Sequence, residues 1–146
     1  MATSTPTPPK VFLDSSAFFA AAYSARGSAR DLLLAATQGR VRLVLSAYVI
    51  EETERNLLAN APHLHAAFVV LRDDLPYQLS DPPDRLIATV ARTIEPKDAP
   101  IVAGAMHAGA RFLATYDRRH LLAHAEPIQS AFGIAVATPE AVLAGL

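Results

Sequence analysis

The sequence predicts an α/β domain built around a mostly parallel β-sheet. Short apolar strings typical of strands alternate with longer segments that carry apolar residues at helical spacing. Strands that alternate with helices favour parallel pairing, because each helix carries the chain back to the start of the next strand. The chain has 146 residues and 51% apolar residues, which suits a single domain with a substantial core.

In the first half of the chain, glycine and serine residues separate the predicted elements. Residues 1–9 are rich in Thr, Ser and Pro and are expected to form a flexible segment. Gly27 and Gly39 are expected to end two successive helices, and Ser46 to cap a longer third one. The predicted elements are a strand at 10–13, helices starting at Ser15 and Ser28, a strand at 41–45, and a helix starting after Ser46.

In the second half, proline and aspartate residues begin most of the predicted helices. Asp98 and Pro100 suit the first turn of a helix that Gly109 ends. Thr138, followed by a proline and a glutamate, suits the cap of a last helix. The other predicted elements are helices at 63–72 and at 84–93, a strand at 111–115, a helical turn starting at Asp117, and a strand at 134–137.

Four carboxylates lie at or shortly after helix starts, and these starts follow or adjoin strands: Asp14, Glu52, Asp98 and Asp117. In a parallel α/β sheet, the junctions after the strands lie at one edge, where ligands bind. The sequence therefore predicts that the four side chains converge in one acidic pocket. Such a cluster is costly unless a cation neutralises it, which points to Mg²⁺ or Mn²⁺.

Each acid also has a purely structural explanation. Aspartate is favoured at helix N-caps, and Glu52 complements the helix dipole from the first turn of its helix. Singly, any of the four fits this explanation. Together they do not, because an ordinary α/β domain has no need of acids at so many junctions of one edge. Asp14 is the most informative, since it follows an apolar strand of the central type and should be buried.

Several neighbours suit the surroundings of such a pocket. The hydroxyls of Ser15, Ser16 and Thr115 are placed to orient carboxylates or bind water, although the two serines suit local helix capping equally well. Arg118 and Arg119 are expected either at the rim of the pocket, where they would hold substrate phosphates, or on ordinary solvated surface without such a role.

Two further residues nearby are weaker candidates. Glu95 lies near Asp98 and could be a fifth acid of the pocket, but a position on a loop surface is favoured. His120 could be a ligand or a base, but a lone surface histidine is more often neither.

The composition narrows the class of protein. Net charge is −1, so nucleic-acid binding would depend on a local basic patch. Cysteine is absent, which excludes disulfides, thiol nucleophiles and cysteine zinc sites and fits the cytosol. No secretory signal or membrane span is expected.

The ordered motifs resemble the PIN-domain family. The family's early strand ending in an aspartate is present as FLDSS, and Ser46, six residues before Glu52, selects that glutamate from its neighbours. KDAPIVAGA with Asp98 resembles the family's third acidic motif, FLATYDRRHL with Asp117 its fourth, and IAVATPEAVL its last strand and helix. The departures are Ser16, where asparagine is common, and Tyr116, where glycine is frequent.

The resemblance implies a single three-layer α/β/α domain over residues 10–146, with a central sheet of four to five strands. It also implies a cytoplasmic Mg²⁺- or Mn²⁺-dependent ribonuclease, in which Asp14, Glu52, Asp98 and Asp117 hold one or two ions. Many single-domain bacterial members are homodimeric toxins of type II toxin–antitoxin pairs, so an antitoxin partner and an RNA substrate are expected.

Three alternatives compete with the ribonuclease interpretation. The first is a PIN-like module that binds a protein partner without catalysis, although all four acids are present. The second is a phosphoacceptor receiver domain, which would need an acidic pair after the first strand and a lysine near the end of the chain. The third is a phosphatase with an aspartate nucleophile, which lacks its second aspartate two residues after Asp14.

Overall fold

A parallel five-stranded sheet forms the centre of the molecule in the computed structural model, which describes residues 6–146. The first five residues of the predicted flexible segment 1–9 lie outside the described residues. The strand order is β3-β2-β1-β4-β5, and all neighbouring pairs are parallel. The strands are β1 (Lys10–Leu13), β2 (Arg42–Leu45), β3 (Tyr77–Leu79), β4 (Phe112–Ala114) and β5 (Ala135–Ala137).

The central position of β1 follows from its sequence. Val11, Phe12 and Leu13 are consecutive apolar residues, and all three are buried. A strand that is apolar without alternation has both faces covered, as expected for the middle of a parallel sheet. Val11 pairs with Leu43 of β2 on one side and Phe112 of β4 on the other.

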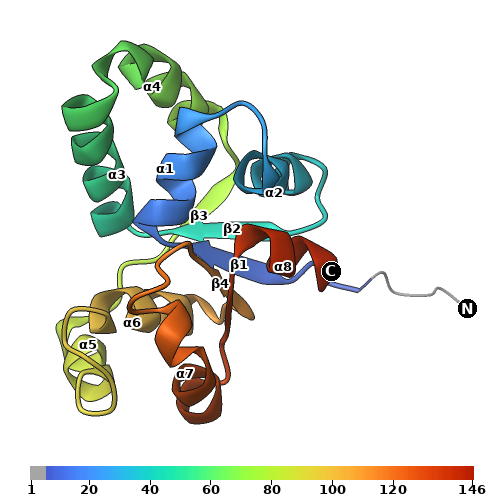
Figure 1. Cartoon of the computed structure of the whole chain (residues 1–146). Coiled ribbons are helices and arrows are strands. Elements are labelled where there is room, and N and C mark those ends of the chain that lie inside the picture. The colour runs from blue at the N-terminus through green and yellow to red at the C-terminus, as the bar shows by residue number, and fades with distance from the viewer. Residues whose placement is uncertain (1–5) are drawn as a thin grey trace, which may run out of the picture.

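Helices cover both faces of the sheet, which confirms the predicted three-layer α/β/α architecture (Figure 1). Chain direction explains which helix covers which face. From β1 to β3 the chain moves toward one edge of the sheet, and it then crosses back to β4 and β5. Because crossovers are right-handed, this reversal moves the helices to the opposite face.

Helices α1 to α4 and the C-terminal α8 cover the first face, and α5 to α7 cover the second (Figure 1). The helices of the first face are α1 (Ser15–Tyr23), α2 (Ser28–Thr37), α3 (Ala47–Asn60), α4 (His65–Asp74) and α8 (Pro139–Ala144). Those of the second are α5 (Asp84–Val90), α6 (Ala99–Ala108) and α7 (Ala125–Phe132). Short 3₁₀ turns precede α4 and α7 at Pro62–Leu64 and Leu122–His124.

Helix α6 lies unusually close to the central strand. A Cβ atom on Gly104 would stand 3.0 Å from two ring carbons of Phe12, so only glycine allows this approach without displacing the ring. The close approach brings the start of α6, and with it Asp98, toward the sheet edge where β1 ends.

Some sequence predictions of local structure were wrong. Strand β3 and helix α7 were missed, and α1 ends at Tyr23, before the predicted end at Gly27. Asp117 begins a turn that leads into the 3₁₀ turn Leu122–His124. Within residues 6–146, no helix is both long enough and apolar enough to cross a membrane.

Candidate functional site

The predicted acidic residues lie around the point where the strand order reverses. Asp14 directly follows β1, and Asp117 lies three residues beyond β4, its neighbour in the sheet. The chain leaves β1 toward one edge and β4 toward the other, so their connections diverge and leave a crevice above the carboxyl ends of these strands. The Asp14 N–H, which donates to the carbonyl of Ala114 at 3.2 Å, fixes the two junctions side by side.

Asp14 is buried, with 5% of its surface exposed, and both of its carboxylate oxygens are hydrogen-bonded. Oδ1 accepts from the N–H of Ala17 at 2.9 Å and the hydroxyl of Ser16 at 2.7 Å. Oδ2 accepts from the hydroxyl of Thr115, 2.5 Å away on the neighbouring strand connection. The carboxylate therefore caps α1, as its structural explanation requires, and also joins two chain segments far apart in sequence.

Burial raises the pKa of Asp14 above its ordinary value of 3.8, and the nearby charge of Asp117 raises it further. The hydrogen bonds from Thr115, Ala17 and Ser16 oppose this rise without cancelling it. A carboxylate whose ionised form is disfavoured in the isolated protein gains from a nearby cation.

Thr115 connects the first and last acidic motifs. Its side chain is fully buried, and its Oγ1 accepts from the N–H of Asp117 at 2.9 Å while donating to Asp14. The Ser16 hydroxyl lies 3.3 Å from Thr115 Oγ1 and accepts from the N–H of Tyr116 at 3.0 Å. The Ser16 hydroxyl therefore binds the site's polar network, whereas the cap of α1 is Asp14 itself.

Glu52 contacts the Asp14 segment through Ser15, whose hydroxyl donates to Glu52 Oε1. The other oxygen accepts from the hydroxyl of Tyr48 at 2.8 Å, and this bond to the carboxylate is the main reason that the Tyr48 pKa is raised. Glu54 points elsewhere and binds His65 at 2.9 Å. Among the glutamates at positions 51, 52 and 54, Glu52 is thus the one with a hydrogen bond to the Asp14 segment, and it is also the glutamate that the Ser46 spacing selects.

Asp98 occupies the N-cap position of α6, but its side chain makes no capping hydrogen bond. The residue is buried, with 5% of its surface exposed, and burial is the main cause that raises its pKa. The charges of Asp117 and Glu95 raise this pKa further, while His120 and Lys97 lower it. Helix capping therefore does not explain Asp98. Instead, its carboxylate is electrostatically coupled to Asp117, whose negative charge raises its pKa.

Asp117 is only partly exposed, and its Oδ1 accepts from the N–H of His120 at 3.1 Å. Arg118 and Arg119, which follow it, are exposed at the rim. Within the described part of the chain, neither arginine nor any lysine forms an ion pair with the four acids. The acids thus lack a protein counter-charge at contact distance, and oxygen ligands of this kind suit a hard divalent cation.

Two contributors to this region lie outside the set of predicted site residues. Tyr48 lies one helical turn before Glu52, and that spacing was a usable signal. Glu95, assigned to a loop surface, is exposed, yet a carboxylate oxygen of it lies within 4.8 Å of ligand atoms of Asp98 and His120. Glu95 and Asp98 are three residues apart in the sequence, a spacing that can place two side chains on one side of a turn, and this spacing was a weak signal that their carboxylates lie close together.

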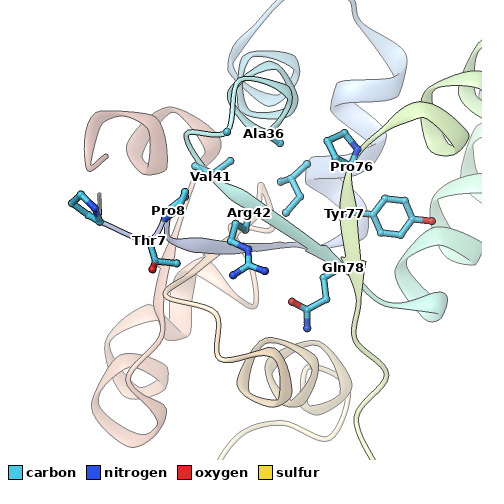
Figure 2. A pocket seen from close by; sticks show the side chains of 11 residues that line it. Thr7, Pro8, Ala36, Val41, Arg42, Pro76, Tyr77 and Gln78 are labelled. Atoms are coloured by element: carbon cyan, nitrogen blue, oxygen red, sulfur yellow. The ribbon is translucent and has the colours of Figure 1, made fainter. Parts of the chain in front are cut away.

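A shallow groove runs from the acidic site along α1 and α3. It is lined by Ser15, Ser16, Phe19, Asn56 and Asn60. A larger hollow lies at the opposite end of the strands, where residues such as Arg42 and Tyr77 begin β2 and β3 (Figure 2). None of the four acids lines the larger hollow, so its size does not mark the chemical site.

Comparisons with known proteins agree with this fold. The family model described as PIN domain matches residues 10–119, which confirms the resemblance drawn from the motifs. No curated protein matches the chain.

Three solved structures share the fold at low identity. PAE2754 from Pyrobaculum aerophilum has a TM-score of 0.61 at 20% identity, over 94% of this chain and 88% of its own. VapC20 of Mycobacterium tuberculosis, a sarcin-ricin loop cleaving toxin, has a TM-score of 0.56 at 18% identity, over 77% of this chain and 94% of its own. FitAcB from Neisseria gonorrhoeae has a TM-score of 0.54 at 19% identity, over 89% of this chain and 98% of its own.

Proposed function

Because the chain belongs to the PIN domain family, we propose that it is an Mg²⁺- or Mn²⁺-dependent endoribonuclease and the toxin of a type II toxin–antitoxin pair. The observation that carries the proposal is the placement of Asp14, Asp98 and Asp117 around the strand switch point, where the charge of Asp117 raises the pKa of the other two and no arginine or lysine among the described residues pairs with them. A purely interacting PIN-like module would have no need of Asp98, whose side chain makes no capping hydrogen bond.

In this proposal Asp14, Asp98 and Asp117 hold one or two divalent cations. The cation, when bound, supplies a Lewis acid that polarises the phosphodiester and makes water a better nucleophile. Thr115 and Ser16 hold the Asp14 carboxylate in place through their hydroxyls. The Asp14 carboxylate thereby keeps a fixed direction during the reaction.

We propose that Glu52 acts either as a ligand of the ion or by orienting the attacking water. Its two oxygens accept hydrogen bonds from Ser15 and from Tyr48. These two hydroxyls fix the direction of the carboxylate at the side of the site. At the rim, Arg118 and Arg119 are exposed and suited to hold the phosphates that flank the scissile bond.

The groove beside the acids supports single-stranded RNA as the substrate. Phe19, at the groove, stacks on Tyr23 at a centroid distance of 5.8 Å and an interplanar angle of 18°. Single-stranded nucleic acids bind through bases stacked on aromatic rings, and amides such as Asn56 can hydrogen-bond the base edges. A duplex, whose bases are already stacked, would not use this surface.

Substitution of Phe19 by leucine tests the groove. We expect the KM for a single-stranded RNA oligonucleotide to rise about 5- to 150-fold, since stacking of one base contributes about 1–3 kcal/mol. Leucine keeps the apolar contact of this partly buried side chain with the core. Phe132→Leu on α7 is the matched control, a partly buried ring that contacts the core from the other face of the sheet. Equal KM values for the two variants would contradict the assignment.

Production of the protein without a partner is expected to arrest bacterial growth, because a toxin cleaves essential RNA of the cell that makes it. The sarcin-ricin loop cleaving activity of the structurally similar VapC20 supports this expectation. Viable counts after induction measure it, with the Asp117→Asn variant at equal protein level as control. Normal growth by cells that contain active enzyme would contradict the toxin role.

We further propose that the protein acts in the cytoplasm as a homodimer and binds a cognate antitoxin there. The proposal rests on family membership and on the RNA substrate, which is found in that compartment. Co-purification with the product of the adjacent gene, followed by loss of RNA cleavage, would support the antitoxin.

A further inference from the structure

A second group of potential metal ligands lies beside the acidic site. One ligand atom each from Glu95, Asp98 and His120 lies within 4.8 Å of the other two. Glu95 and Asp98 precede α6, whereas His120 belongs to the connection after β4. The group therefore combines two carboxylates with an imidazole and shares only Asp98 with the four predicted acids.

The backbone holds the three residues in place. The N–H of Asp98 donates to the carbonyl of Glu95 at 3.0 Å, closing a turn that brings both carboxylates to one side. The N–H of His120 donates to Asp117 Oδ1 at 3.1 Å, which fixes the turn that carries the imidazole. Neither arrangement depends on contacts between the three side chains themselves.

The three side chains converge without satisfying one another. The Asp98 residue has 5% of its surface exposed, and among residues 6–146 its carboxylate accepts no hydrogen bond and forms no ion pair. His120 Nδ1 lies 3.9 Å from Glu95 Oε2, beyond hydrogen-bonding distance. A carboxylate that belongs to a nearly buried residue, has no protein partner and lies beside two other ligand groups suits a bound cation.

We propose that Glu95, Asp98 and His120 form a binding site for a divalent transition-metal ion, with Mn²⁺ as its test ion. An imidazole nitrogen favours transition metals over Mg²⁺, whereas the carboxylates accept either class. Contact between His120 Nδ1 and Glu95 Oε2 at 3.9 Å is compatible with two ligands of one ion at bond lengths of about 2.1 Å. The site goes beyond the proposed function, since nuclease chemistry at the three aspartates does not require a nitrogen ligand.

Pulsed electron paramagnetic resonance of the Mn²⁺-loaded protein tests the site. The untagged full chain is titrated with MnCl₂, and ¹⁴N coupling to bound Mn²⁺ is measured. We expect nitrogen coupling in the unsubstituted protein and its loss in His120→Ala, together with a rise of at least about 10-fold in the Kd of one Mn²⁺ ion. His107→Ala, which removes an exposed histidine of α6, is the matched control and should keep the coupling.

Absence of nitrogen coupling in the unsubstituted protein, or its persistence in His120→Ala, would overturn the site. Glu95→Gln should weaken binding of the same ion, and an unchanged Kd would remove Glu95 from it. Unchanged melting temperatures of the metal-free variants show that folding is retained. The readout does not involve RNA, so an inactive protein with nitrogen coupling would refute the nuclease proposal and support this site.

Discussion

The Asp14→Asn variant is expected to lose RNA cleavage and, in the absence of metal, to melt at a higher temperature than the unsubstituted protein. Cleavage should fall at least about 100-fold, because loss of a ligand exceeds the 10- to 100-fold effect typical of residues that only support ligands. Stability should rise because burial disfavours the ionised form of Asp14, as its raised pKa indicates. Asparagine is uncharged and can still accept from the N–H of Ala17 and the hydroxyl of Ser16.

The same cause fixes the sign of a pH dependence. When the pKa of a carboxyl is higher in the folded than in the unfolded chain, the folded state binds more protons between the two values. Stability of the metal-free protein therefore rises as pH falls through the raised pKa of Asp14 toward 3.8. The slope should be smaller in Asp14→Asn. Thermal melts in EDTA between neutral pH and about pH 4 measure it, and a lower melting temperature for Asp14→Asn at neutral pH would contradict the account.

Replacement of Thr115 by valine is expected to lower both stability and activity. The change keeps the shape of a fully buried side chain but leaves Asp14 Oδ2 and the N–H of Asp117 without the hydroxyl they share. Loss of these bonds should cost about 1–3 kcal/mol. Cleavage should fall about 10- to 100-fold, since the hydroxyl fixes two carboxylate segments. Urea unfolding and initial cleavage rates measure the two effects.

The same chemical change at Thr53 provides the control, with the opposite sign for stability. Thr53 is fully buried, and its hydroxyl has no hydrogen-bond partner among the described residues. Thr53→Val should therefore raise the free energy of unfolding by about 1 kcal/mol, because it removes an unsatisfied buried polar group. If both threonine variants were destabilised equally, the Thr115 network would not be the cause.

The fold could be predicted from the sequence wherever an element carries its own signal. The strand at residues 10–13 is a continuous apolar run, and Ser46 and Thr138 are recognisable caps whose side chains accept the expected N–H groups. Strand β3 gives no such signal, because it is three residues long, lies at the sheet edge and exposes Gln78 and Leu79.

Helix α7 was also missed, and for a different reason. Pro127 stands near its start, where a proline is allowed by the helix but breaks the apolar pattern in the sequence. The preceding segment adds to the difficulty, because only a short helical turn was predicted from Asp117 and no helix after it.

In the candidate site, too, some contacts could be predicted from the sequence and others could not. Asp14 and Asp117 could be placed together because both follow strands that the sequence predicts as parallel. Whether Ser16 caps a helix or binds the polar network could not be decided, since this depends on Thr115, which is 99 residues away in the chain. The approach of Glu95 to His120 is also tertiary, because it depends on how the turn before α6 meets the connection after β4.

Cleavage of a defined single-stranded RNA by the purified protein tests the central claim most directly, when divalent ions and product ends are controlled together. The account predicts cleavage with Mg²⁺ or Mn²⁺, none with EDTA, and products with 5′-phosphate and 3′-hydroxyl ends by mass spectrometry. These ends follow because water attacks phosphorus and the 3′-oxygen leaves. Cleavage that persists in EDTA, or products with 2′,3′-cyclic phosphate, would contradict a metal-dependent hydrolysis at Asp14, Asp98 and Asp117.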